Sequence, residues 1–135
     1  MLLSIKKHNS YSIKKTQASP ILQFGRFGIK TLSFSRLTEN QFSLINRGLT
    51  KYLKKVTGGK KTTKLWTVKT LNLTLTKLSS ESRMGKGKGS IYAKGVFLRP
   101  GDVIFEFEGI SCQQMRFIFS FLKNQIPGKI TTLVR

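Results

Sequence analysis

The residues best suited to chemistry lie in one short stretch, in which glycines alternate with lysines after an arginine. The stretch runs Arg83-Met84-Gly85-Lys86-Gly87-Lys88-Gly89. Glycines at every second position have no side chain to pack and are costly to order within a strand or a helix. Their backbone N–H groups and the adjacent cationic side chains are suited to hold one anion, such as a phosphate. We predict a phosphate-binding loop, with a solvated surface loop as the alternative.

Few other residues offer catalytic or metal-binding chemistry. One cysteine, Cys112, and one histidine, His8, are too few for a structural zinc site or an intramolecular disulfide. We expect Cys112 to be a small buried residue and not a nucleophile. Glu106 and Glu108 would share one face of a strand, but no general acid or base accompanies them. The glycine spacing matches neither G-x-x-x-x-G-K-[ST] nor G-x-G-x-x-G. We predict that the protein is not an enzyme and uses no metal or cofactor.

The charge of the chain indicates a polyanionic partner. Its 135 residues contain 25 lysines and arginines against five acids, which gives a formal net charge of +20. Such an excess destabilises a compact state through self-repulsion unless a polyanion neutralises it. No stretch approaches the roughly 18 consecutive apolar residues of a membrane-spanning helix. We favour nucleic acid as the partner. The alternative is a free-standing basic module that binds nucleic acid or an anionic membrane.

Residues 1–37 form a basic segment without any acid, and they show neither helical periodicity nor sustained alternation. We predict an extended N-terminal arm. An organelle transit peptide has a similar composition, but no amphipathic helix is visible, and the stretch Phe24-Gly25-Arg26-Phe27-Gly28 is suited to docking on a surface. The aromatic residues Phe24, Phe27 and Phe34 either stack on unpaired bases or pin the arm to the domain, and we favour pinning.

Residues 38–135 are predicted to form a single α+β domain, with two helices packed on a mainly antiparallel sheet and a projecting Gly-Lys loop. The pairs Thr38 with Gln41 and Ser111 with Gln114 are capping boxes that start the helices. The first helix ends at Gly58-Gly59. Its inward face is apolar, with either Leu44 or Ile45 as the inward residue of one turn. Its opposite face carries Arg47, Lys51, Lys54 and Lys55.

The remaining segments of the domain alternate in the manner of strands. We predict one strand over residues 65–77, a hairpin of residues 91–98 and 103–108, and a short final strand over residues 130–134. Pro100-Gly101 marks the turn of the hairpin. In its second arm, Phe105 and Phe107 face the core while Glu106 and Glu108 face outward.

The chain resembles the universal ribosomal protein L-sixteen family in its bacterial and organellar form, over about residues 24–135. The stretch from Arg83 to Gly89 looks like the signature loop of that family. Residues 24–30 are similar to its F-G-x-F-G-[LI]-K segment. Further agreement is found at Arg36-Leu37-Thr38, Lys64-Leu65-Trp66, Pro100-Gly101, Val103-Ile104-Phe105-Glu106 and Ile126-Pro127. Residues 68–77 depart from the family, which has a basic, proline-containing stretch there.

The resemblance implies a structural component of the large ribosomal subunit that binds rRNA and helps shape the aminoacyl-tRNA site near the peptidyl-transferase region. Its implied partners are large-subunit rRNA, tRNA in the aminoacyl and peptidyl sites, and neighbouring ribosomal proteins. In the family the arginine that matches Arg83 can be hydroxylated in bacteria. The many Lys, Phe, Ile, Ser and Thr residues, with two alanines only, Ala18 and Ala93, favour a mitochondrial form over a plastid or bacterial one.

We predict that RNA is bound by two groups of residues, and that recognition depends on RNA shape and backbone more than on base sequence. In the loop, the glycines allow the backbone to approach RNA closely, and the cationic side chains contact the phosphates. These residues are Gly85, Gly87, Gly89, Arg83, Lys86 and Lys88. Cations of the arm and the first helix anchor the body of the protein to RNA. They are Arg26, Lys30, Arg36, Arg47, Lys51, Lys54 and Lys55.

Overall fold

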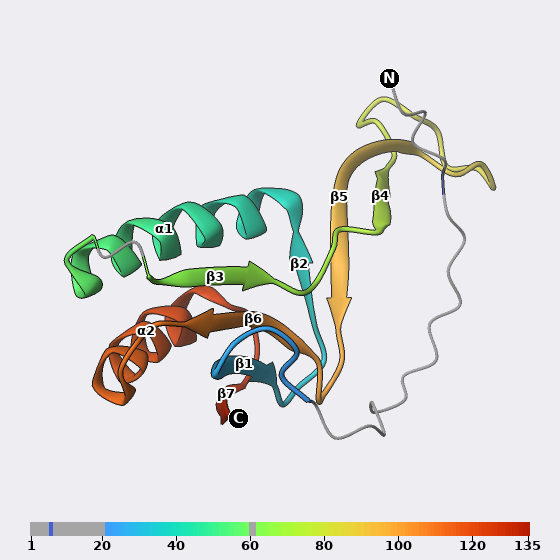
Figure 1. Cartoon of the computed structure of the whole chain (residues 1–135). Helices are drawn as coiled ribbons and strands as arrows, with labels where there is room; N and C mark the ends of the chain where they lie inside the picture. The colour runs from blue at the N-terminus through green and yellow to red at the C-terminus, as the bar shows by residue number, and fades with distance from the viewer. Residues whose placement is uncertain (1–5, 7–20, 60–61) are drawn as a thin grey trace.

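The fold of the chain is given by a computed structural model that describes Lys6, residues 21–59 and residues 62–135. Most of the predicted arm, including His8, lies outside the described residues. The elements follow one another along the chain as shown in Figure 1. They are β1 (Phe27–Thr31), β2 (Ser35–Thr38), α1 (Glu39–Thr57), β3 (Lys64–Thr67), β4 (Leu73–Lys77), β5 (Ser90–Leu98), β6 (Val103–Glu108), α2 (Cys112–Gln125) and β7 (Ile130–Val134).

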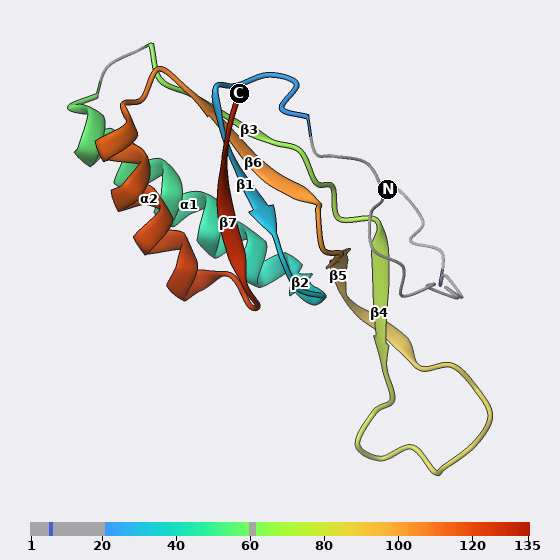
Figure 2. The same ribbon diagram turned by 90° about the horizontal axis from the view of Figure 1, so that it is seen from below.

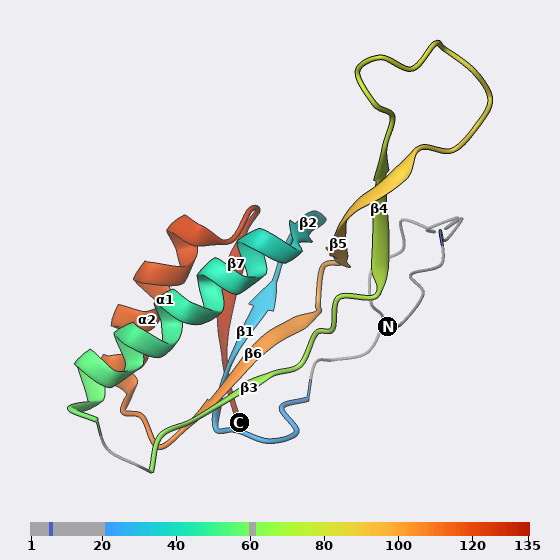
Figure 3. The ribbon, with the colours of Figure 1, turned by 90° about the horizontal axis from the view of Figure 1, so that it is seen from above.

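The strands form two antiparallel sheets, one of four strands in the order β3-β6-β1-β7 and one of three in the order β2-β5-β4. Figures 2 and 3 show both helices on one side of the four-stranded sheet. Residues 21–26, which we call the segment before β1, lie on the other side. The core lies between the helices and the sheet, where Ile29, Phe105 and Phe107 pack with Leu49 and Ile118, all fully buried. The predicted α+β class, with two helices on an antiparallel sheet, is confirmed.

Both helices begin where the local signals place them, and α1 also ends at its predicted residue. The backbone N–H of Thr38 donates to Gln41 Oε1 at 3.0 Å at the start of α1. At the start of α2, Ser111 and Gln114 exchange two hydrogen bonds of 2.9 and 3.3 Å. Gly58 ends α1 in the left-handed conformation, with φ at 63°, which glycine adopts without steric cost. Ile45 is the inward residue of its turn, whereas Leu44 is exposed.

The predicted strand over residues 65–77 is wrong, because the segment forms two strands in different sheets. β3 pairs with β6 in the four-stranded sheet, whereas β4 pairs with β5 in the three-stranded sheet. The Val68 N–H donates to the Ile104 carbonyl of β6 at 2.9 Å, which is the last backbone hydrogen bond of this segment to the four-stranded sheet. Alternation of apolar and polar residues defines the face of a strand that is buried but not its partner strand. The change of sheet was therefore invisible in the sequence pattern.

The predicted hairpin of residues 91–98 and 103–108 is also wrong. β5 pairs with β2 and β4, and β6 pairs with β1 and β3, so these two strands are not neighbours. The turn between them does form, since Asp102 N–H donates to the Arg99 carbonyl at 3.0 Å. Gly101 N–H then donates to the Thr31 carbonyl at 2.8 Å, and Thr31 N–H to the Asp102 carbonyl at 2.9 Å. These bonds to β1 make the turn a corner at which the chain passes from one sheet to the other.

Residues 27–37, which we assigned to the arm, contribute strands β1 and β2. β1 lies inside the four-stranded sheet, between β6 and β7. Phe27, Gly28 and Ile29 are all buried, because helices cover one face of β1 and the preceding segment covers the other. A strand buried on both faces does not show apolar and polar alternation, which explains why the sequence pattern did not predict it. The final strand, β7, joins the sheet beside β1 as predicted.

Two side chains are placed differently from their prediction. Glu106 does not face outward, since its exposed fraction is 1%. Its strand is interior, and the segment before β1 covers the face that carries the Glu106 side chain. Cys112 is exposed and not buried, because it is the first residue of α2 and precedes the inward residue Met115. No helix within the described ranges is both long and apolar enough to cross a membrane.

Candidate nucleic-acid interface

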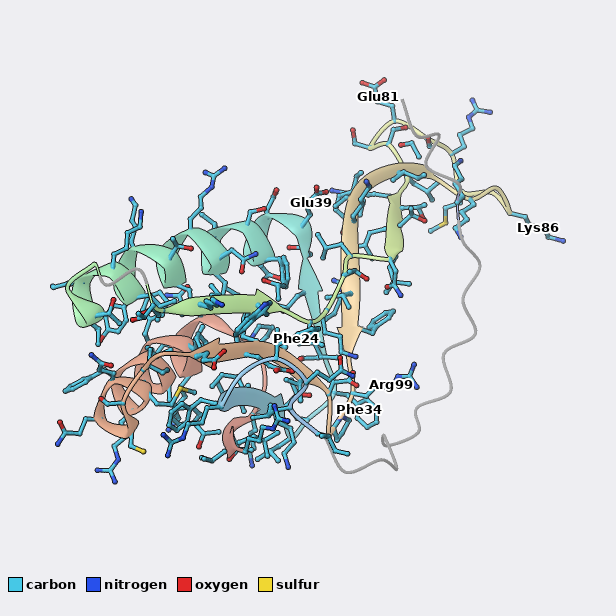
Figure 4. All side chains as sticks on the ribbon, in the orientation of Figure 1. Phe24, Phe34, Glu39, Glu81, Lys86 and Arg99 are labelled. Atoms are coloured by element: carbon cyan, nitrogen blue, oxygen red, sulfur yellow. The ribbon has the colours of Figure 1, made fainter. Side chains whose placement is uncertain are left out.

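The Gly-Lys loop connects β4 to β5 and forms the tip of a hairpin that projects far beyond the body (Figures 2 and 3). Arg83 and Lys86 are exposed, and Lys88 is half-buried. Figure 4 shows Lys86 at the outer end of the loop, with its side chain directed away from the protein. The loop curves around a hollow lined in part by Ser79 and Ser82, together with Arg83 and Lys88. The structure thus brings the three predicted loop cations onto one projection.

The three glycines of the loop differ in what the protein itself requires of them. A Cβ added at Gly89 would lie 2.4 Å from the carbonyl oxygen of Lys77, so close strand pairing at the neck of the hairpin needs glycine there. A Cβ added at Gly85 or Gly87 would have no atom within 4 Å, and neither residue has a positive φ. The fold of this chain therefore gives no reason for glycine at Gly85 and Gly87. Close approach of a partner to the backbone does give one.

The exposed side of α1 carries a second group of cations, which we call the α1 basic face: Arg47, Lys51, Lys54 and Lys55. The opposite side of the helix is buried through Phe42, Ile45, Leu49 and Leu53. Residues three, four, seven and eight positions apart share one side of a helix, so these four cations form one continuous surface. Lys54 and Lys55 lie in the last turn of α1, where the helix dipole stabilises positive charge.

Three predicted cations lie apart from both groups. Arg26 is exposed, and its guanidinium carbon lies 5.6 Å from the ring centre of Phe27, a cation–π contact. Lys30 is half-buried in β1, and Arg36 is exposed in β2. All three belong to the strands β1 and β2 or directly precede them. The structure therefore does not join them to the loop or to the α1 basic face.

An ion pair joins the two segments through which the projecting hairpin leaves the body. Lys69 Nζ lies 3.0 Å from Asp102 Oδ1, and the two side chains are 30% and 11% exposed. Lys69 lies between β3 and β4, and Asp102 lies between β5 and β6. Asp102 Oδ2 also accepts the backbone N–H of Arg99 at 3.0 Å. We missed this contact because it depends on which strands change sheet, although an acid beside Pro-Gly in so basic a chain was a signal.

A buried carboxylate holds the segment before β1 against the sheet. The Glu106 carboxylate accepts the backbone N–H groups of Gln23, Phe24 and Gly25 at 3.2, 2.7 and 2.9 Å. Gly25 lies so close to the sheet that an added Cβ would be 2.5 Å from the Phe107 carbonyl oxygen. Glu106 is thus engaged with the backbone and does not form a catalytic pair with exposed Glu108. Within the described part of the chain, no cluster of three or more His, Cys, Asp or Glu residues could hold a metal ion.

The predicted pinning of the arm by aromatic residues is confirmed for Phe27 and Phe24. Phe27 is 2% exposed and belongs to the core. Phe24 stacks on Trp66 of β3, with ring centres 5.9 Å apart and ring planes inclined by 23°. Phe34 is 46% exposed, in the connection between β1 and β2. The segment predicted to dock on a surface therefore docks on the protein's own sheet.

Comparison with known proteins gives a family match and several relatives. The model of a family described as ribosomal protein L16p/L10e matches residues 4–133. A protein named large ribosomal subunit protein uL16m, from Chondrus crispus, is 52% identical over 130 residues, which are 96% of this chain and 94% of the relative. Large ribosomal subunit protein uL16 from Buchnera aphidicola subsp. Cinara cedri (strain Cc) is 30% identical over 108 residues, covering 80% of this chain and 75% of the relative.

Proposed function

The chain belongs to the ribosomal protein L16p/L10e family, and on this premise we propose that it binds large-subunit rRNA and helps shape the aminoacyl-tRNA site near the peptidyl-transferase region. It is a structural constituent of the large ribosomal subunit and not an enzyme. The similarity to uL16m of Chondrus crispus supports the mitochondrial ribosome as its location. Its partners in this proposal are rRNA, tRNA in the aminoacyl and peptidyl sites, and neighbouring ribosomal proteins.

The observation that best supports the proposal is the shape of the projecting hairpin. Arg83, Lys86 and Lys88 belong to the loop between β4 and β5, which projects from the body, and the same loop contains two glycines, Gly85 and Gly87, that the protein's own packing does not require. Backbone N–H groups and ammonium groups on such a projection can meet the same phosphate. In our proposal the α1 basic face anchors the body to rRNA, and the hairpin reaches towards tRNA.

The loop is tested by replacing both Lys86 and Lys88 with alanine in the protein expressed in mitochondria. Because the two side chains are remote from the core, we expect normal incorporation of the variant into the large subunit and a severalfold slower peptide synthesis. Incorporation is measured by co-sedimentation, and elongation by labelling of mitochondrial translation products. The variant Arg116→Ala with Lys123→Ala removes the same charge from the exposed side of α2, and it should elongate normally.

The results can also contradict the proposal. Unchanged peptide synthesis in the loop variant would remove any functional role of the lysines. If the wild-type chain migrates apart from ribosomal particles at moderate salt, the alternative of a free-standing basic module is favoured.

A further inference from the structure

One aromatic ring of the docked segment is only half covered by the protein. Phe24 is 51% exposed, although one side of its ring stacks on Trp66. Both lie on the face of the four-stranded sheet opposite the helices. Phe107, the register partner of Leu65, belongs to the core on the helix side. Trp66 and its register partner Glu106 are each one position along their strands, so their side chains point to the opposite face. Figure 4 shows Phe24 in front of the sheet, on the side of the segment before β1. A residue that only pins the segment would be expected to be covered, as Phe27 is.

The exposed ring is held in place without any partner. The Phe24 N–H donates to Glu106 Oε2 at 2.7 Å, and the flanking N–H groups of Gln23 and Gly25 bind the same carboxylate. The position of Gly25 against the Phe107 carbonyl leaves no room for the backbone to shift inward. A ring that is fixed before binding loses little conformational freedom when a ligand stacks on it.

The charges around the ring suit a nucleotide. Lys64 is exposed and shares the face of Trp66, since the two residues are two positions apart on β3. Lys30 of β1 is half-buried and lies two positions after Gly28, which is the register partner of Glu106. Glu108 is the register partner of Lys64. Unlike Glu106, which is buried on the same face, Glu108 is exposed to solvent. The net charge of +20 supplies the long-range attraction for a polyanion.

We infer that the Phe24–Trp66 stack is a binding platform for one unpaired base of rRNA, with Lys64 placed near the adjoining phosphate. The inference rests on the proposed rRNA binding and adds a second mode of recognition to it. Bases in an A-form duplex are already stacked and their edges are hidden, so a ring platform selects single-stranded segments, loops and bulges. Stacking on an aromatic ring tolerates any base because every base has a π face.

Trp66 makes the platform directly measurable, since it is the single tryptophan of the chain. The full-length protein is titrated with a short fluorescently labelled oligoadenylate, with an adenine–uracil duplex of equal length, and with heparin. Tryptophan fluorescence reports the platform, and the anisotropy of the label reports binding. We expect single-stranded oligoadenylate to change Trp66 fluorescence, whereas the duplex and heparin bind without a comparable change.

Variants then separate stacking from pinning. Phe24→Leu keeps an apolar contact with Trp66 but removes the π face, and it should weaken oligoadenylate binding about tenfold and abolish the change in Trp66 fluorescence. Phe34→Leu is the matched control, because Phe34 is similarly exposed and lies outside the stack. Thermal unfolding of both variants is compared with that of the wild type, and the wild-type titration stands on its own if Phe24→Leu does not fold.

The outcomes distinguish the platform from RNA binding in general. If oligoadenylate binds with no change in Trp66 fluorescence, or changes it no more than heparin does, the platform is wrong and the proposed rRNA binding stands. Equal affinities of folded Phe24→Leu and Phe34→Leu for oligoadenylate also overturn the platform. If the wild-type protein binds neither RNA, the proposed function itself fails.

Discussion

Replacing Glu106 with alanine is expected to lower the free energy of unfolding by about 3 to 5 kcal/mol. Three backbone N–H groups, of Gln23, Phe24 and Gly25, lose their acceptor at once. Hydrogen bonds to a charged group are each worth more than those between neutral groups. The segment before β1 would then be released from the sheet, and its own Leu22, which is 4% exposed in the native fold, would become exposed to water. Urea unfolding followed by far-ultraviolet circular dichroism measures the loss.

The neighbouring acid provides the control for this substitution. Glu108 lies two residues further along the same strand but is exposed, so Glu108→Ala should change stability by less than about 0.5 kcal/mol. Glu106→Gln keeps one acceptor oxygen and should fall between the two alanine variants. If Glu106→Ala and Glu108→Ala unfold at the same urea concentration, the three hydrogen bonds contribute nothing and the carboxylate does not hold the segment.

Replacing Lys51 and Lys55 with alanine is expected to reduce the affinity for large-subunit rRNA about 10- to 30-fold near physiological salt. Each phosphate that the α1 basic face neutralises releases condensed counterions. Removing two such contacts should lower the slope of log affinity against log salt concentration by roughly 1.4 to 1.8. The measurement is filter binding of the full chain to transcribed mitochondrial large-subunit rRNA over a series of salt concentrations.

A charge-matched pair on the other helix separates a defined contact from bulk charge. Arg116 and Lys123 are both exposed on α2, and their double alanine variant carries the same net charge as the α1 variant. We expect it to keep nearly the wild-type affinity and salt slope. Equal losses for the two double variants would mean that net charge alone governs binding and that the α1 basic face is not a specific interface.

The parts of the fold that local chemistry determines were predictable from the sequence. The starts of α1 and α2 follow from the capping residues Thr38 and Ser111, and the end of α1 follows from Gly58. The inward and outward sides of α1 follow from its periodicity. The prediction that the α1 basic face lies on the outward side of this helix was therefore correct. In each case the signal lies within a few residues of the feature that it determines.

The features that were missed depend on contacts between segments far apart in sequence. Which strand pairs with β4 or β5 is not encoded in the alternation of either strand, so two sheets were read as one. Glu106 alternates like an exposed strand residue, and only the docking of residues 23–25, more than 80 positions earlier, explains its burial. β1 escaped prediction because it is buried on both faces. The Lys69–Asp102 ion pair likewise required knowledge of both sheet crossings.

A density map of the mitochondrial large ribosomal subunit that contains this chain tests the central claim most directly, because it shows what the projecting hairpin and the α1 basic face contact. We predict that the backbone at Gly85 and Gly87 lies against RNA, with Lys86 and Lys88 at phosphates, and that Arg47, Lys51, Lys54 and Lys55 lie along an rRNA backbone. A hairpin surrounded by solvent or by protein alone, with α1 turned away from RNA, would contradict the proposed interface.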